Sequence, residues 1–116
     1  MQSNFNKLKT INLWEVEQFA YLLEKLKATT AVDGSNLLDC SCVFFSSEIS
    51  DGDRHNHWDM PVLLAGNANG YFQTGQHINY ASEQPVSNLF MSMLDAVGAT
   101  QSSFGNSTGL LNSIGT

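Results

Sequence analysis

The chain has 116 residues, of which 42% are hydrophobic and only 14% carry a charge. This length suits one domain, and the apolar content is too high for a chain that stays disordered in solution. The formal net charge of −6, with only five lysines and arginines, leaves too few cations to neutralise a nucleic-acid backbone. No apolar run approaches the ~20 residues needed to cross a bilayer. Neither nucleic acid nor a membrane is therefore expected as a partner.

The first expected element is a helix. Apolar side chains recur at helical spacing along one stripe, at Phe5, Leu8, Val16, Phe19, Leu23 and Leu26. Because Asn12 and Glu15 also fit a capping box, the helix starts either near Asn4 or at Asn12, and it ends at about Lys27.

Two short apolar runs follow, CSCVFF at residues 40–45 and MPVLLAG at residues 60–66. Neither alternates between apolar and polar residues, which is typical of parallel strands that are covered on both faces. With the helices, they predict an α/β fold with a mainly parallel sheet. Cys40 and Cys42 are expected to be buried free thiols, because a disulfide at this spacing along one strand would be strained. A bridge or a pair of metal ligands is the alternative, and the compartment stays unknown.

A second helix is expected to begin at Pro85 and to end at Gly98. Its expected apolar face consists of Val86, Leu89, Phe90, Met93, Leu94 and Val97. Residues 99–116 are rich in serine, glycine, asparagine and threonine, which favours a loop or a loosely held tail. Residues 1–98 are therefore expected to form a single α/β domain fragment, and residues 99–116 a C-terminal tail.

The polar loop between the two apolar runs holds much of the ionisable chemistry of the chain. Its candidate ligands are Glu48, Asp51, Asp53, Asp59, His55 and His57. Oxygen and imidazole ligands together suit Zn²⁺, Mn²⁺ or iron better than Ca²⁺, and open α/β sheets bind ligands where strands end. A loop kept polar for solubility is the alternative. Trp58 has two interpretations, as the wall of a substrate crevice or as a cover for the sheet edge.

Nearly the whole chain is covered by three recognisable stretches, INLWEVEQFAYLLEKLKAT, LLDCSCVFFSSEISDGDRHNHWDMPVLLAG and SFGNSTGLL. They resemble the C-terminal region of the uncharacterised bacterial family named after a His-x-x-Ser-His-His (HXXSHH) motif. That family is similar to the alkaline phosphatase and sulfatase superfamily of metal-dependent hydrolases. The resemblance implies the C-terminal portion of an alkaline-phosphatase-like, doubly wound sheet flanked by helices, in an exported or periplasmic parent protein.

The resemblance also implies a set of metal ligands. It places Glu48 where the superfamily has a metal-binding aspartate, and His55 at a metal-binding histidine, with His57 as the alternative. Ile49 stands where a further histidine is expected, so a standard two-metal centre is not implied. Asp53 is another candidate ligand, and Zn²⁺ or another divalent metal is expected to bind weakly.

The motif that names the family and the nucleophile of the superfamily are both expected upstream of the first helix, and the sequence begins with Met1 just before that helix. The chain is therefore expected to be the C-terminal segment of a phosphate or sulfate ester hydrolase-like protein and to be inactive alone. The alternative is a binding or structural module without catalysis, whose acidic loop contacts a cation or a partner. Exposed strand edges and helix faces predict a homodimer, or pairing with the missing N-terminal portion of the parent.

Overall fold

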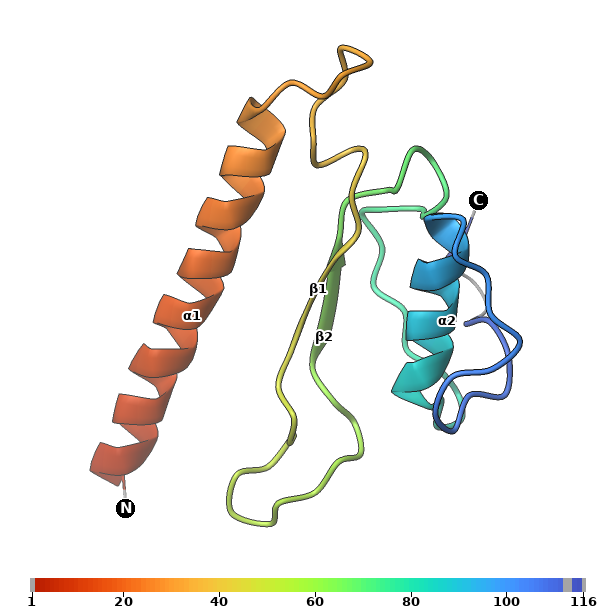
Figure 1. The fold of residues 1–116 in the computed structure, drawn as a ribbon. Helices are drawn as coiled ribbons and strands as arrows, with labels where there is room; N and C mark the ends of the chain where they lie inside the picture. The colour runs from red at the N-terminus through yellow and green to blue at the C-terminus, as the bar shows by residue number, and fades with distance from the viewer. Residues whose placement is uncertain (1, 112–113, 116) are drawn as a thin grey trace. The chain divides into compact units, whose positions relative to one another are not determined.

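The structure is a computed structural model, and it describes residues 2–111, 114 and 115. Its elements follow in the order α1 (Gln2–Ala28), β1 (Val43–Ser46), β2 (Val62–Ala65) and α2 (Val86–Ala96) (Figure 1). The chain divides into two compact units, Met1–Leu37 and Leu38–Thr116. The chain contains both helices and strands, so the prediction of a mixed α/β structure is confirmed.

The first unit consists of α1 and the turn that follows it. Of the two predicted starts, the one near Asn4 is the closer, because the helix already begins at Gln2. No glycine or proline interrupts the helical spacing before Asn12, so nothing in the sequence delays the start. Among the described residues, no helix is both long and apolar enough to cross a bilayer.

The strands β1 and β2 form a hairpin. They pair antiparallel, with Phe44 opposite Leu64 and Phe45 opposite Leu63. The prediction that these two strands run parallel is therefore wrong. Parallel neighbours need a crossover segment, usually a helix, whereas residues 47–61 contain no helix and reverse direction at a bridge between Asp51 and Asn56.

The helix α2 packs against this hairpin through aromatic side chains. The ring of Phe44 meets the ring of Phe90 edge to face at 5.1 Å between centroids, and Phe90 meets Phe104 at 6.1 Å. As predicted, α2 begins directly after Pro85, and Gly98 follows its end with a φ of 74°. The hairpin and α2 thus pack against each other as two small layers within the second unit.

The buried side of α2 is more polar than predicted. Ser87, Asn88 and Ser92 are all buried there, whereas Val86 and Val97 are 45% and 62% exposed. Polar side chains are buried on a helix when other groups of the protein supply their hydrogen bonds. The segment after α2 supplies them here.

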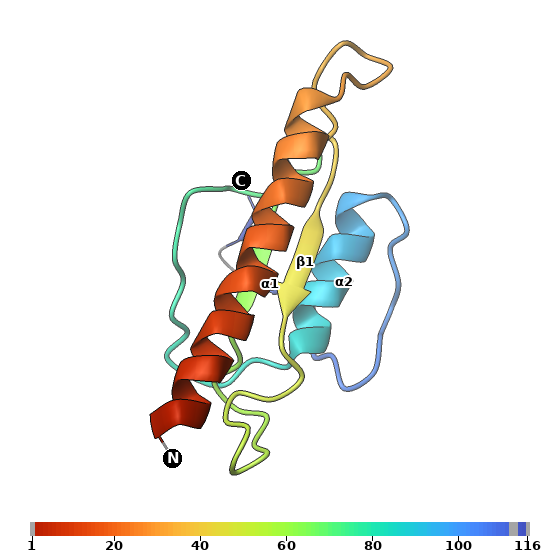
Figure 2. The ribbon, with the colours of Figure 1, turned by 90° about the vertical axis from the view of Figure 1, so that its left-hand side faces the viewer.

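The segment that follows α2 runs back alongside the helix (Figure 2). The amide of Thr108 donates to Asn88 Oδ1 (2.8 Å), and Asn88 Nδ2 donates to Thr108 Oγ1 (3.0 Å). The amide of Leu111 donates to Ser92 Oγ (2.9 Å). The described part of residues 99–116 contains neither helix nor strand, as predicted, and these bonds hold it on α2.

The end of the hairpin away from its loop is closed at Gly66. This residue has a φ of 86°, and a Cβ atom built on it would lie 2.2 Å from the carbonyl oxygen of Ser41 and 2.6 Å from that of Leu38. The amide of Ala68 donates to the same Ser41 oxygen at 3.0 Å. Only glycine has both the backbone freedom and the small size that this approach requires.

One polar cluster joins the turn after β2 to the end of α2. The hydroxyl of Tyr71 donates to Asp95 Oδ2, and Thr100 Oγ1 donates to Asp95 Oδ1, both at 2.7 Å. The bond from Thr100, and then that from Tyr71, keeps the pKa of Asp95 below its ordinary value. Burial, followed by the bond to Asp95, raises the pKa of Tyr71 to about 12.

We predict that Gly66→Ala destabilises the protein more than Gly70→Ala. Both glycines have a positive φ, so each alanine carries the ~1–2 kcal/mol strain of left-handed backbone. Only Gly66 adds an overlap with backbone oxygens, since nothing lies within 4 Å of a Cβ at Gly70. We expect a loss of more than about 2 kcal/mol in the free energy of unfolding for Gly66→Ala, measured by urea titration. Equal losses for the two variants would contradict the close approach of Gly66 to the carbonyl oxygens of Ser41 and Leu38.

We predict that Asp95→Asn reduces stability at neutral pH but not in strong acid. A carboxyl group with a lowered folded-state pKa stabilises the fold above its unfolded pKa of ~3.9, and this stabilisation disappears as the pH falls through the folded value. The difference in unfolding free energy between wild type and Asp95→Asn should therefore shrink as the pH is lowered below about 4. Urea titrations across this range measure it, with Asp59→Asn in the polar loop as control. A difference that does not change with pH would exclude the proposed linkage.

Candidate functional site

The candidate site is an open hollow between the end of β1 and the start of α2. Its volume is about 470 Å³. Its lining residues are Phe44, Ser46, Ser47, Glu48, His57, Met60, Val86 and Phe90. Most of the surface that these residues expose to the hollow is apolar, and all of them belong to the Leu38–Thr116 unit. Two of the predicted metal ligands, Glu48 and His57, therefore border the same hollow.

His57 is held by the backbone next to the other candidate ligand. Its Nδ1 lies 2.9 Å from the carbonyl oxygen of Glu48. A carbonyl oxygen only accepts, so Nδ1 carries the proton and Nε2 of the neutral ring keeps its lone pair. Metal-ligating histidines are commonly oriented through their second nitrogen in this way. The arms of the loop are also joined by the amide of Ser50, which donates to the carbonyl oxygen of Asn56 at 3.0 Å.

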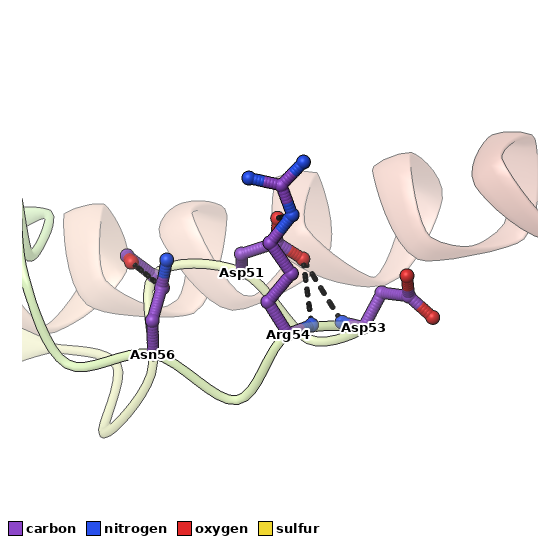
Figure 3. A network of polar contacts seen from close by, with 5 residues as sticks. Asp51, Asp53, Arg54 and Asn56 are labelled. Atoms are coloured by element: carbon purple, nitrogen blue, oxygen red, sulfur yellow. Dashed lines mark hydrogen bonds and ion pairs between the residues drawn. The ribbon is translucent and has the colours of Figure 1, made fainter.

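Asp53 and His55 lie in the turn of the loop and do not line the hollow. The carboxylate of Asp51 organises this turn by accepting hydrogen bonds from the amides of Arg54 (3.2 Å) and Asp53 (3.0 Å) (Figure 3). These two bonds lower the pKa of Asp51. The amide of His55 donates to the Asp51 carbonyl oxygen at 2.8 Å, and His55 has a φ of 52°. Asp51 therefore serves the geometry of the turn.

The described residues contain no group of three or more histidine, cysteine, aspartate or glutamate side chains arranged to hold a metal ion. The lining residues Glu48 and His57 carry carboxylate oxygens and an imidazole nitrogen, donor types whose chemistry fits a divalent cation such as Zn²⁺. Structural zinc sites have four protein ligands. A cation held by this pair alone would keep water in its remaining positions.

The other polar candidates are placed differently. Trp58 is 64% exposed and is not among the residues that line the hollow. Ser46 Oγ donates to the carbonyl oxygen of Pro61 at 2.7 Å, so this hydroxyl is bound to the loop backbone. Cys40 and Cys42 form no disulfide, as predicted, but both are only half-buried, and burial raises the pKa of the Cys42 thiol.

Sequence reasoning missed the apolar part of the site. The sequence places Phe44 and Met60 in the two apolar runs and Phe90 on the helix face, and it does not predict that they line a common hollow. The lining is assembled from segments about 45 residues apart, and no local pattern shows that they meet. The usable signal is the position of Phe44 and Met60 on either side of a polar loop.

Comparisons with protein-family models, with curated proteins and with solved structures found no significant match. The resemblance to the HXXSHH family therefore stays a prediction based on the three sequence stretches.

Proposed function

We propose that the chain is the C-terminal segment of a metal-dependent phosphate or sulfate ester hydrolase-like protein, to which it contributes the metal ligands Glu48 and His57. One observation carries the assignment of these ligands: both residues line one hollow, and a hydrogen bond from Nδ1 of His57 to the Glu48 carbonyl leaves Nε2 able to coordinate. Carboxylate and imidazole together suit Zn²⁺ and similar ions. The hydrolase assignment itself rests on the sequence resemblance.

His57 takes the place that the resemblance gave first to His55. His55 has a positive φ in a turn organised by Asp51, whereas His57 borders the hollow beside Glu48. A ligand set needs its donors directed at one point, and shared lining of one hollow supports this for Glu48 and His57. Asp53 is left out of the proposed ligand set for the same reason as His55.

We also propose that the hairpin belongs to a larger, mainly parallel sheet. Strands β1 and β2 have four residues each, and an isolated two-stranded hairpin of this kind is only marginally stable. Many doubly wound sheets carry an antiparallel strand at one edge. An antiparallel hairpin at such an edge is compatible with the alkaline-phosphatase-like architecture that the resemblance implies.

For this chain alone, the proposed activity is weak binding of a divalent cation without turnover. Metal-ion hydrolysis needs the Lewis acid, a positioned nucleophile and an open coordination position in one place. The hydroxyl of Ser46 is bound to the loop backbone, and no G-x-S-x-G turn surrounds Ser46, Ser47 or Ser50. The resemblance assigns the nucleophile to another part of the parent protein.

A non-catalytic binding module is the second candidate, and the lining of the hollow favours it. Phe44, Met60, Val86 and Phe90 form an apolar surface next to the Glu48 and His57 pair. Pockets that are mainly apolar with a few polar groups are typical of sites for small organic ligands. In this function the pair would orient a ligand and would not activate water.

We predict that Zn²⁺ binds with micromolar or weaker affinity and that His57→Ala and Glu48→Gln each reduce this affinity by about tenfold or more. His55→Ala is the matched control and should leave the affinity unchanged, since His55 lies in the turn. Isothermal titration at neutral pH measures the affinities. Tight binding that survives His57→Ala, or an equal loss in His55→Ala, would contradict the assigned ligands.

We predict that the purified chain, saturated with Zn²⁺ or Mn²⁺, does not hydrolyse aryl phosphates or aryl sulfates above the rate of His57→Ala. A colorimetric substrate panel measures this rate. Zinc binding without turnover is the result expected for a segment of a hydrolase site. Binding of an apolar fluorescent probe that is equally strong with and without Zn²⁺, and that disappears in Phe90→Ala, would favour the binding module instead.

A further inference from the structure

The polar side chains that line the hollow between β1 and α2 mostly accept hydrogen bonds. Glu48 carries a carboxylate, and the neutral His57 ring keeps the lone pair of Nε2, because Nδ1 donates to the Glu48 carbonyl oxygen. The hydroxyl of Ser46 already donates to the carbonyl oxygen of Pro61 at 2.7 Å, so toward a ligand it can only accept. Of the lining side chains, only the hydroxyl of Ser47 can act as donor or acceptor. The polar part of the lining therefore suits a ligand group that donates hydrogen bonds.

The charges around the hollow have the same preference. Glu48 is the one residue of fixed charge among the lining residues, which include no lysine or arginine. The Leu38–Thr116 unit has seven aspartates and glutamates, at positions 39, 48, 51, 53, 59, 83 and 95, but only one lysine or arginine, Arg54. Arg54 lies in the turn of the loop, where its Nε is 3.8 Å from Asp51 Oδ2. The unit therefore attracts cations and repels anions.

The rest of the lining is apolar and contains two aromatic rings. Phe44 and Phe90 meet edge to face at 5.1 Å, and Met60 and Val86 complete the apolar surface. The volume of about 470 Å³ is within the range of pockets that hold small organic molecules. Aromatic rings also attract cations through their faces. The hollow thus combines an apolar wall with an acceptor-rich, negatively charged end.

We propose that, without a metal, this hollow binds an organic ammonium ion, namely a primary amine attached to an aromatic or other apolar group. An ammonium group has three donors and no acceptor, so it matches the Glu48 carboxylate and Nε2 of His57. The apolar group of the same ligand contacts Phe44 and Phe90. This inference rests on the binding function proposed for the hollow and not on the hydrolase assignment.

A second apolar surface, on α1 in the Met1–Leu37 unit, provides an internal comparison. Its lining residues are Phe5, Leu8, Lys9, Asn12, Leu13 and Val16. The one charged residue of this lining is Lys9, so its charge is opposite to that of Glu48. A ligand that recognised apolar surface alone would bind at both places. An apolar ammonium ion should instead prefer the hollow beside Glu48, because Lys9 repels it.

Nuclear magnetic resonance titration of the isotope-labelled full chain, with a chelator present to remove metal ions, tests the proposal. The probes 3-phenylpropylamine, 3-phenylpropan-1-ol and 3-phenylpropionate share one skeleton and differ in terminal charge, and propylamine keeps the ammonium group without the ring. We expect 3-phenylpropylamine to shift the amide signals of Glu48, His57 and Phe90 with a dissociation constant of about a millimolar, as befits a ligand of this size. The alcohol should bind about threefold or more weakly, and propylamine and the carboxylate about tenfold or more weakly.

Substitution of Glu48 tests the role of its charge. Glu48→Gln keeps the backbone carbonyl that holds His57, and it should lower the affinity for 3-phenylpropylamine by about threefold or more without changing that for the alcohol. Asp53→Asn is the matched control, because it removes the same charge from the same loop outside the lining. It should change the affinity by less than about twofold. The spectrum of each variant also shows whether the fold is kept.

Three results would overturn the proposal, and they differ in what else they affect. Equal affinities for amine and alcohol, or equal losses in Glu48→Gln and Asp53→Asn, overturn the preference for ammonium and leave a binding module. Failure of all four compounds to bind overturns the binding function as well. Signal shifts confined to α1 overturn the choice of site. Affinity for Zn²⁺ is measured separately by calorimetry, so the metal assignment stands or falls independently of these results.

Discussion

The geometry of the second unit depends on the close approach of Gly66 to the carbonyl oxygens of Ser41 and Leu38. Few apolar side chains are fully buried in this unit, so backbone contacts carry much of the positioning. The approach fixes one end of the hairpin, and the strand register then sets the position of Phe44 beside Phe90. The other end carries the loop with Glu48 and His57. The candidate site is therefore positioned by a contact at the opposite end of the hairpin.

The polar side of α2 is the second constraint. Asn88 and Ser92 are buried and bind Thr108 and Leu111, so the segment after the helix supplies hydrogen bonds to polar groups on the buried side of α2. A buried polar group without a partner costs about 1–3 kcal/mol, so these bonds favour one position of the segment over others. Since α2 also contributes Phe90 to the hollow, a segment that holds α2 also supports the site.

The sequence predicted the elements better than their arrangement. Local signals in the sequence mark the elements. Pro85 directly precedes α2, Gly98 follows its end, and the short apolar runs contain most of the two strands. The direction of the second strand is not a local property, because it depends on how residues 47–61 turn. Likewise, the buried Asn88 finds its hydrogen-bond partner in Thr108, twenty residues later, and no local pattern shows this. For the proposed site, the sequence pointed to the loop, and a choice between its two histidines needed the backbone conformation.

The bond between His57 and the Glu48 backbone links the two proposed ligands, because the residue whose carbonyl orients the imidazole is also the residue that supplies the carboxylate. Motion of one ligand is therefore restricted by the position of the other. Protonation of the ring leaves Nδ1 able to donate to the same carbonyl oxygen, while Nε2 loses the lone pair that a cation needs. A proton on Nε2 would thus prevent the proposed coordination without breaking the bond that orients the ring.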